Sequence, residues 1–280
     1  MAIIRPLAPG QKVKLAKIDP GDTHGVKKPE TAAEYELILD RRLPDLQELL
    51  YAAECHSVLV VLQGLDTAGK DGTIKHVMAR LNPEGCRVDS FKAPTPEELS
   101  HDFLWRAHKC TPALGWMEIF NRSHYEDVLV TRVDELVPKE ILKGRYEEIN
   151  EFERLLARSG TIVLKFFLYI SKEEQRARLL AREEDKSKAW KLSTSDWVTH
   201  EKYDAYIEAY EDALERCTTE HAPWYVIPSN KKWFRNLAVA QTIADVLHPY
   251  ESTWHGKLEE RGKRILAELK AMRESQKPVG

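Results

Sequence analysis

The sequence predicts an α/β fold in which a doubly wound, five-stranded parallel sheet is flanked by helices. Two observations lead to this prediction. Five short apolar runs, rich in β-branched residues, alternate with longer amphipathic stretches. A glycine-rich segment follows the first run and leads directly into a helical pattern, which is typical of the first strand and helix of such sheets.

The chain begins with a segment, 1–30, whose prolines and glycines predict an extended arm that either wraps the domain or stays mobile. Apolar residues then recur at helical spacing over 31–54. Pro44 either kinks this run or opens a second helix, and both alternatives stay open. Residues 57–63 (SVLVVLQ) form a continuous apolar run, which predicts a strand buried on both faces.

The same alternation continues along the chain. Further strands are expected at 87–92, 116–121, 161–170 and 224–228. Helices are expected at 73–81, 96–108, 125–136, 145–159, 172–183, 198–216 and 232–247. A last amphipathic stretch, 258–272, carries Leu258, Ile265, Leu266, Leu269 and Met272 on one face. It either packs on its own domain or bridges subunits. The expected division is an arm at 1–30, a domain at 31–250, and a C-terminal helix and tail at 251–280.

The composition is that of an ordinary soluble globular protein, with 42% hydrophobic and 31% charged residues among 280. A net charge of −3 argues against a nucleic-acid partner, which would favour a basic balance. No apolar stretch approaches the ~18–20 residues of a membrane span, and the first residues lack the apolar centre of a signal peptide. The four cysteines are far apart and form no CxxC pair, so neither a zinc site nor a disulfide framework is indicated. We therefore expect a cytoplasmic protein without a membrane partner.

The strongest functional signal is the segment GLDTAGKDGT at 64–73, which satisfies the pattern GxxxxGK. Its position between a buried strand and a helix is important, because the loop amides and the helix N-terminus then form a nest for phosphate oxygens. Lys70 adds a positive charge to this nest. A glycine-rich turn that only joins strand to helix is the alternative. The expected phosphate-binding residues are Gly64, Thr67, Ala68, Gly69, Lys70, Asp71, Gly72 and Thr73.

Two carboxylates distinguish this loop from an ordinary ATP-binding loop. Asp71 occupies the position after the lysine, where a Ser or Thr normally binds Mg²⁺, and Asp66 lies within the loop itself. A carboxylate facing phosphate is tolerated when a divalent cation lies between them. Asp66 is therefore expected to bind metal or to activate the attacking phosphate. Asp71 is either a second ligand or a residue that favours the helix N-terminus.

A second motif, IFNRSHYED at 119–127, is expected at the carboxyl end of the third strand, the edge where open parallel sheets bind ligands. Asn121 stands where a metal-binding Asp of the Walker B type would be expected, and Arg122 is suited to clamp phosphate oxygens. Alternatively, Asn121 and Ser123 cap the next helix while Arg122 pairs with Glu126 on its surface.

A basic segment at 176–191, with six Lys and Arg against three Asp and Glu, follows the fourth expected strand. Nucleoside monophosphate kinases have a mobile lid at this place, so we expect a helical lid over 176–197. Its arginines, Arg178 and Arg182, would neutralise charge on the transferring group. A solvated helix face with i,i+4 ion pairs is the alternative.

Together with WKLS at 190–193, these two motifs resemble those of the polyphosphate kinase 2 family, over roughly 35–247. The resemblance implies a P-loop kinase fold like that of thymidylate kinase, with a lid. It also implies Mg²⁺ dependence, with Mn²⁺ as the alternative ion, and assembly into homodimers or homotetramers. Catalytic roles are carried over by matching position to Asp66, Lys70, Arg122, Arg178 and Arg182. Asn121, Glu126 and Lys191 are expected to contact phosphate or nucleotide.

The second motif departs from the pattern Phe-Asp-Arg-Ser-Trp-Tyr-Asn-Arg of many family members. Asn121 replaces the Asp, His124 replaces the Trp, and Glu126 and Asp127 replace Asn-Arg. This variant resembles the branch that accepts both AMP and ADP. Because Asn121 carries no charge, Glu126 or Asp127 is expected to take over metal binding, which gives a candidate set of Asp66, Asp71, Glu126 and Asp127.

The donor implied by this resemblance, inorganic polyphosphate, is a chain of charges without a base, so it needs a basic track. Lys75, Arg80, Arg87 and Lys92 follow the loop and either form such a track or are solvated surface. We therefore expect a Mg²⁺-dependent transfer of phosphoryl groups from polyphosphate to AMP and ADP. Two other functions stay in consideration. Asp66 disfavours an ATP-dependent nucleotide kinase, and the intact lysine and lid disfavour a regulator that only binds.

Overall fold

The computed structural model describes residues 3–28, 42–185 and 193–275, and its centre is a five-stranded parallel sheet. The strands are β1 (Ser57–Gln63), β2 (Cys86–Ser90), β3 (Met117–Asn121), β4 (Thr161–Tyr169) and β5 (Trp224–Pro228). Their order across the sheet is β2-β3-β1-β4-β5, and every neighbouring pair is parallel. The predicted fold class is confirmed.

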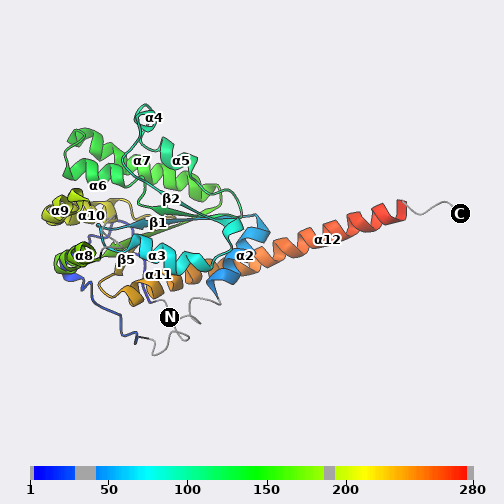
Figure 1. Cartoon of the computed structure of the whole chain (residues 1–280). Helices are drawn as coiled ribbons and strands as arrows, with labels where there is room; N and C mark the ends of the chain where they lie inside the picture. Colours follow the sequence, from blue (N-terminus) through cyan, green and yellow to red (C-terminus); the bar gives the residue numbers. More distant parts are fainter. Residues whose placement is uncertain (1–2, 29–41, 186–192, 276–280) are drawn as a thin grey trace.

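The burial of β1 on both faces explains why its sequence is one continuous apolar run. Every residue of β1 is buried, because helices cover both faces of the sheet. Val58, Val60 and Leu62 belong to one core cluster, and Leu59 and Val61 belong to the other. The first cluster includes side chains of α2 (Leu43–Ala53), α3 (Lys70–Val77) and α11 (Lys232–Leu247). The second includes side chains of α6 (Glu126–Val133), α7 (Lys139–Arg158) and α10 (Tyr203–Arg216). Figure 1 shows the two sets on opposite sides of the sheet.

Two expected helices are each divided in the structure. The expected helix at 96–108 is divided into α4 (Pro96–Leu99) and α5 (Trp105–Lys109), because polar side chains bind nearby backbone groups between them. Ser100 Oγ donates to the carbonyl of Glu97, and Asp102 Oδ1 accepts from the amide of Leu104. The expected helix at 198–216 is divided into α9 (Thr194–Glu201) and α10, which meet at Lys202.

Other helices agree more closely with expectation. Strand β4 leads into α8 (Lys172–Glu184), and α11 has the bounds that the sequence predicts. Pro44 lies in the first turn of α2, so the alternative in which it opens a helix is the one observed. Four short 3₁₀ helices complete the described elements: η1 (Leu15–Lys17), η2 (Met78–Arg80), η3 (Pro83–Gly85) and η5 (His248–Tyr250).

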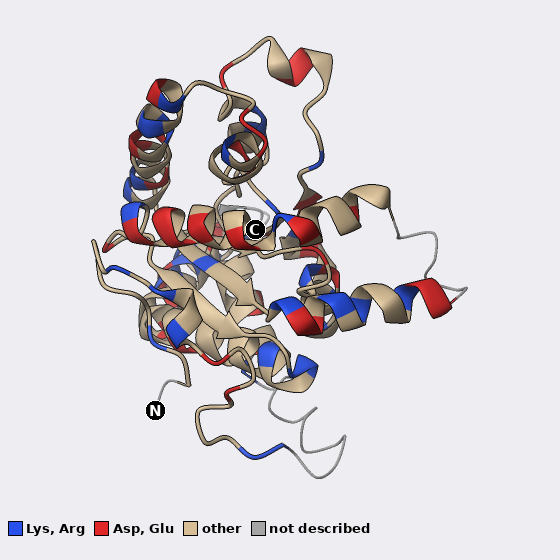
Figure 2. Ribbon diagram, turned by 90° about the vertical axis from the view of Figure 1, so that its left-hand side faces the viewer, with Lys and Arg blue, Asp and Glu red and all other residues tan. Residues whose placement is uncertain are grey.

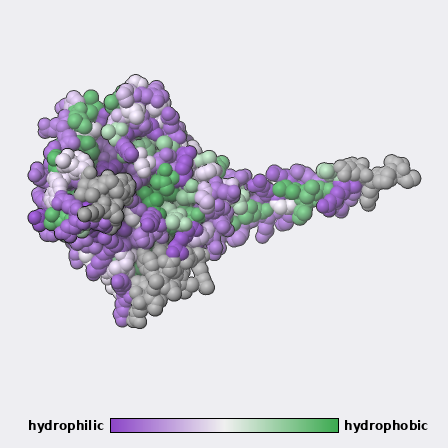
Figure 3. Space-filling view, in the orientation of Figure 1, coloured by the Kyte–Doolittle hydropathy of each residue, from purple (hydrophilic) through white to green (hydrophobic). Residues whose placement is uncertain are grey.

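The two ends of the chain behave differently. The N-terminal arm runs along the body, where the amide of Leu7 donates to the carbonyl of Trp224 and the amide of Leu15 to Glu211. The last helix, α12 (Glu251–Ser275), packs on α2 through its first turns, where Trp254 is fully buried. It then leaves the body, and its apolar residues from 265 onward are exposed (Figures 1 and 3). This part does not pack on its own domain, one of the two expected alternatives.

Charge is distributed over the surface of the helices rather than gathered on one of them. Figure 2 shows Lys and Arg beside Asp and Glu along the same helices, as the net charge of −3 suggests. Within the described ranges, no helix is both long and apolar enough to cross a membrane.

Candidate active site

The loop at 64–69 joins the carboxyl end of β1 to the first turn of α3. The helix begins at Lys70, three residues earlier than the sequence predicts, so its first amides lie within the motif. Gly69 precedes it with φ +110°, a conformation that a side chain would strain. A helix N-terminus preceded by such a loop forms an anion site. The predicted nest residues are therefore brought together.

Lys70 is buried, and its side chain packs against the loop at 64–69. Its Nζ atom donates to the carbonyl of Gly64 at 2.6 Å and to that of Leu65 at 3.3 Å. Burial and, to a smaller extent, the nearby charge of Arg122 lower the pKa of Lys70 to about 8, against the opposing effect of Asp66. A phosphate group in the nest would favour the charged amine, since an opposite charge stabilises it.

Arg122 connects the two motifs. It has a left-handed φ of +61°, and its amide donates to the carbonyl of Leu62 at 3.0 Å, which fixes the end of β3 beside β1. Its guanidinium pairs with Asp66 of the loop and, at 3.2 Å, with Glu126. Burial alone would lower the pKa of Arg122, but Glu126 and Asp66 raise it, so the group stays cationic. The pair with Glu126, the alternative offered by the sequence, is observed. Binding of phosphate by Arg122 stays a prediction.

Asn121 is the last residue of β3 and lies at the same edge of the sheet as Arg122. Its Nδ2 atom donates to Asp71 Oδ1 at 3.0 Å, so the amide contacts the first turn of α3 rather than capping α6. Ser123 is buried and accepts hydrogen bonds from Gln63 and from the amide of Tyr125. The side chains of the second motif thus either face the loop or anchor the motif in the core.

A closed polar cluster holds the rest of the second motif. Glu153 on α7 and Lys165 on β4 form a fully buried ion pair, and Tyr125 and His124 both contact Glu153. Burial would raise the pKa of Glu153, but Lys165 and His124 lower it, so the carboxylate stays charged. Asn121 before Arg122 and Ser123 after it are both held by hydrogen bonds. The backbone of Arg122 is therefore fixed, with its side chain directed at Asp66.

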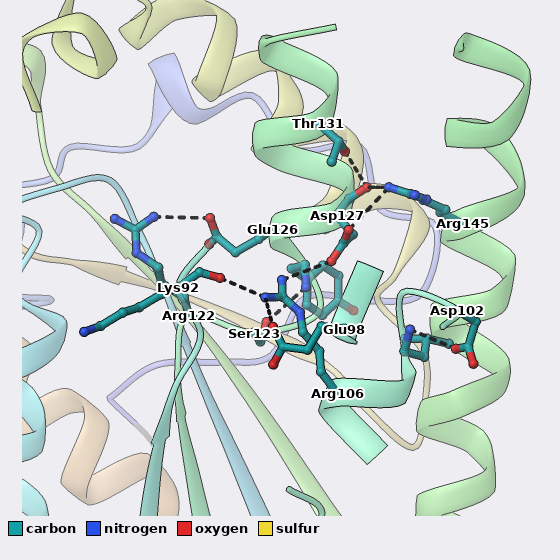
Figure 4. A network of polar contacts seen from close by, with 12 residues as sticks. Lys92, Glu98, Asp102, Arg106, Arg122, Ser123, Glu126, Asp127, Thr131 and Arg145 are labelled. Carbon is teal, nitrogen blue, oxygen red and sulfur yellow. Dashed lines mark hydrogen bonds and ion pairs between the residues drawn. The ribbon is translucent and has the colours of Figure 1, made fainter. Parts of the chain in front are cut away.

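The predicted metal ligands are not equivalent. Asp127 is held by Arg106 at 3.3 Å and by Arg145 at 3.5 Å, and Figure 4 shows it turned toward these two residues. Burial raises the pKa of Asp127 against the opposing effect of the two arginines. Asp66 and Glu126 instead converge on Arg122 at the mouth of the loop.

In the described part of the chain, no three Asp, Glu, His or Cys side chains are gathered in a ready-made metal site. The oxygens of Asp66, Asp71 and Glu126 nevertheless suit Mg²⁺, which often takes one or two carboxylates and completes its shell with phosphate oxygens and water.

Arg178 lies behind the loop rather than on a lid over it, which differs from its expected position. It is 9% exposed, and its guanidinium donates to the carbonyls of Thr67 and Ala68 at 2.9 and 3.2 Å. The same group donates to the carbonyls of Ser229 and Asn230 after β5. Arg182 lies one turn later on α8 and is half-buried. Burial and the charge of Asp66 raise the pKa of Asp196, and the charge of Arg182 opposes this shift. Lys191 lies outside the described residues.

The four residues of the expected basic track lie on separate elements. Lys75 is exposed on α3, Arg80 is half-buried in η2, and Lys92 is exposed just after β2. Figure 4 shows Lys92 beside Arg122. Arg87 on β2 is instead paired with Glu118 of the neighbouring strand β3 at 2.8 Å and with Asp89 of its own strand. Burial raises the pKa of Glu118 to about 8, although Arg87 lowers it.

Two further residues near the site were missed by sequence reasoning. Asp196 on α9 is buried and close enough to feel the charges of Asp66 and Arg122. Its local signal is the capping box with Ser193, which indicates a helix start and not a site. Arg235 on α11 donates to the carbonyl of Ala68 at 3.1 Å. The sequence gives no clear signal for it, since α11 also carries the charged residues Lys232 and Asp245.

Comparison with known proteins agrees with this geometry. The sequence model of the family described as polyphosphate kinase 2 matches residues 26–253. An AMP/ADP-polyphosphate phosphotransferase of Meiothermus ruber is 51% identical over 240 residues, which cover 85% of this chain and 90% of that protein. An ADP-polyphosphate phosphotransferase of Rhodopseudomonas palustris is 42% identical, over 80% of this chain and 82% of that protein. The crystal structure of polyphosphate kinase 2 from Arthrobacter aurescens superposes with a TM-score of 0.81 at 41% identity, covering 89% of this chain and 92% of that one.

Proposed function

Because the chain belongs to the polyphosphate kinase 2 family, we propose that it transfers phosphoryl groups from inorganic polyphosphate to AMP and ADP, giving ADP and ATP. The observation that supports this most directly is the ion pair between Asp66 and Arg122, which joins a GxxxxGK loop to the second motif. An ordinary ATP-binding loop has no carboxylate at this place. The similarity to the AMP/ADP-polyphosphate phosphotransferase of Meiothermus ruber supports the choice of both acceptors.

The residues of the site have separate roles in this proposal. The loop amides and Lys70 bind the phosphoryl group, and its transfer in line needs positioning and charge neutralisation more than covalent chemistry. Arg122 exchanges a carboxylate partner for a phosphate oxygen as negative charge spreads in the transition state. Arg182 supports the same charge from α8. Arg178 acts on the phosphoryl group only indirectly, because it holds the loop through the carbonyls of Thr67 and Ala68.

A divalent cation completes the site in this proposal. Asp66, with Asp71 or Glu126, would hold Mg²⁺, or Mn²⁺ in its place, and the ion would shield phosphate oxygens from these carboxylates. The protein is proposed to work in the cytoplasm as a homodimer or homotetramer. The exposed end of α12 is available for contact between subunits.

The proposal is tested by incubating the purified protein with AMP and Mg²⁺, with either polyphosphate or ATP as the donor. We expect ADP and then ATP to form from AMP and polyphosphate alone. Transfer that requires ATP as the donor would instead identify a nucleoside monophosphate kinase. Binding of both ligands without transfer, at any concentration of Mg²⁺, would identify a regulator.

A further inference from the structure

Arg235 is a charged residue on the buried side of helix α11. It is 3% exposed, and its neighbours on α11 include Phe234 and Leu237, which belong to the buried core. A buried charge is unfavourable unless hydrogen bonds satisfy it. Nε and Nη2 of Arg235 donate to Asn236 Oδ1 at 3.1 and 2.8 Å, and Nη1 donates to the carbonyl of Ala68 at 3.1 Å. The guanidinium is therefore fixed on one side and contacts the phosphate-binding loop on the other.

The glycines of the loop are shaped around this guanidinium. A Cβ atom on Gly69 would lie 1.8 Å from Nη1 of Arg235, and one on Gly72 would lie 3.0 Å from its Nη2. Both distances are shorter than a normal contact between non-bonded atoms. Arg235 thus occupies the space that side chains at these two positions would need.

The same carbonyl is held from a second direction. Arg178 on α8 donates to Ala68 O at 3.2 Å, so two buried guanidinium groups share this acceptor. A trans peptide is planar, and its C=O and N–H groups point in opposite directions. When Ala68 O is turned toward the two arginines, the amide of Gly69 is turned away from them. That side is the nest in which loop amides bind phosphate.

We propose that Arg235 is a positioning residue that, together with Arg178, orients the Ala68–Gly69 peptide and thereby sets the affinity of the loop for phosphate. The ligand is the terminal phosphate segment of a linear polyphosphate. Arg235 does not touch this ligand, because it is buried beneath the loop. The inference rests on the proposed function for its kinetic readout, whereas its binding readout stands without it.

The first test measures binding of tripolyphosphate by calorimetry to folded Arg235→Ala, Arg235→Lys and the unchanged protein. We expect Arg235→Ala to raise the Kd by tenfold to about a hundredfold, since a displaced peptide loses its alignment with the ligand. Arg235→Lys should recover part of this loss, because it retains one donor. The matched control is Leu247→Ala, a fully buried residue at the far end of the same helix, about three turns beyond Arg235. It should lower the Tm while leaving the Kd unchanged.

The second test uses Gly72→Ala, which presses on Arg235 without a left-handed backbone. In the unchanged chain this substitution should raise the Kd and the KM for polyphosphate more than it lowers kcat. In the Arg235→Lys background the same substitution should have a much smaller effect, because the shorter side chain leaves room. Additive effects of the two changes, or an unchanged Kd in both Arg235 variants, would overturn the inference.

The outcomes separate this inference from the proposed function. An unchanged protein that binds tripolyphosphate but transfers no phosphoryl group would contradict the function alone. An active unchanged protein with insensitive Arg235 variants would contradict the inference alone. If Arg235→Ala does not fold, the comparison of Gly72→Ala in the two remaining backgrounds still decides the question.

Discussion

Two kinds of arginine meet at the phosphate-binding loop, and they differ in both exposure and partner. Arg178 and Arg235 are buried behind the loop and donate to carbonyl groups of its backbone. Arg122 is 33% exposed at the mouth of the loop and pairs with the carboxylates of Asp66 and Glu126. Arg178 also pairs with the carboxylate of Glu174 on its own helix, at 2.7 Å. What distinguishes the three arginines is therefore their position and whether they bind the backbone or a carboxylate of the loop.

The difference indicates which arginines can take part in chemistry. If a buried guanidinium moved toward a substrate, its carbonyl partners would lose their hydrogen bonds. Unpaired buried carbonyls are unfavourable, so such a group stays in place. Arg122 can exchange a carboxylate oxygen for a phosphate oxygen with little change in its geometry, because both anions accept the same fork of N–H groups. We therefore assign loop shape to the first kind and charge neutralisation to the second.

Lys70 combines properties of both kinds, since it is buried yet charged, and its loss should give the largest effect. Lys70→Ala should lower kcat by at least about 10²–10³-fold, the usual effect of removing one donor to a developing charge. The Tm should stay close to that of the unchanged protein, because removal of a buried charge offsets the loss of the hydrogen bonds to the carbonyls of Gly64 and Leu65. Lys202→Ala, at a surface lysine paired with Asp134, is the control and should retain full activity. Near-normal turnover of Lys70→Ala would remove the loop from the mechanism.

Asp66→Asn should come next in size, despite nearly equal shape. The amide cannot hold a hard cation as the carboxylate does, so turnover should be very low and should respond to added Mg²⁺. Turnover is measured against Mg²⁺ concentration, with nucleotide binding measured separately.

Asp127→Asn is the matched control for this change, since Asp127 is held by Arg106 and Arg145. It should lower stability without changing the Mg²⁺ dependence. Full activity of Asp66→Asn at ordinary Mg²⁺ would reduce Asp66 to a role in shaping the turn.

The pH dependence of kcat/KM should show a further, smaller effect of Lys70. Burial lowers the pKa of Lys70 to about 8, and the protonated amine is the form that binds phosphate. As the pH rises through about 8 the free enzyme loses this proton, so kcat/KM should fall on the alkaline side. Bound phosphate favours the charged amine, so kcat itself should stay constant to higher pH. A kcat/KM that is flat to pH 10 would show that Lys70 keeps its proton.

The smallest expected effect is that of salt concentration on substrate affinity. Salt should weaken binding of the donor, polyphosphate, more than binding of the acceptor, AMP. The apparent affinity for polyphosphate should fall more steeply with salt concentration than that for AMP, by analogy with counterion release from nucleic acids. Lys92→Ala should reduce the slope for polyphosphate, because Lys92 is exposed beside Arg122. Arg87→Ala is the control, since Arg87 is paired with Glu118. Equal slopes for both ligands would count against a basic track.

Local patterns in the sequence predicted the parts of the molecule that depend on neighbouring residues. The five strands, the phosphate-binding loop and the bounds of α11 all follow from periodicity and turn chemistry. The break between α4 and α5 was missed, because hydrogen bonds of Ser100 and Asp102 outweigh a helical pattern there.

Contacts between distant residues could not be predicted in this way. Arg178 was expected on a lid because it lies in a basic segment, yet it binds a carbonyl 111 positions away in the sequence. Arg235 contacts Ala68 across 167 positions, and neither contact has a local signature. Arg122, by contrast, lies at a strand end beside the loop, as expected, because it belongs to a compact motif.

The most direct test of the two kinds of arginine compares Arg122→Ala with Arg178→Ala, measuring kcat, the KM for both substrates and the Tm of each variant. We expect Arg122→Ala to keep the Tm and to lose most of its kcat. Arg178→Ala leaves buried carbonyls unpaired, so it should lose about 1–3 kcal/mol of stability, or several °C of Tm, and raise the KM for polyphosphate. The reverse pattern, with a stable Arg178→Ala that loses only kcat and an unstable Arg122→Ala that turns over normally, would contradict the account.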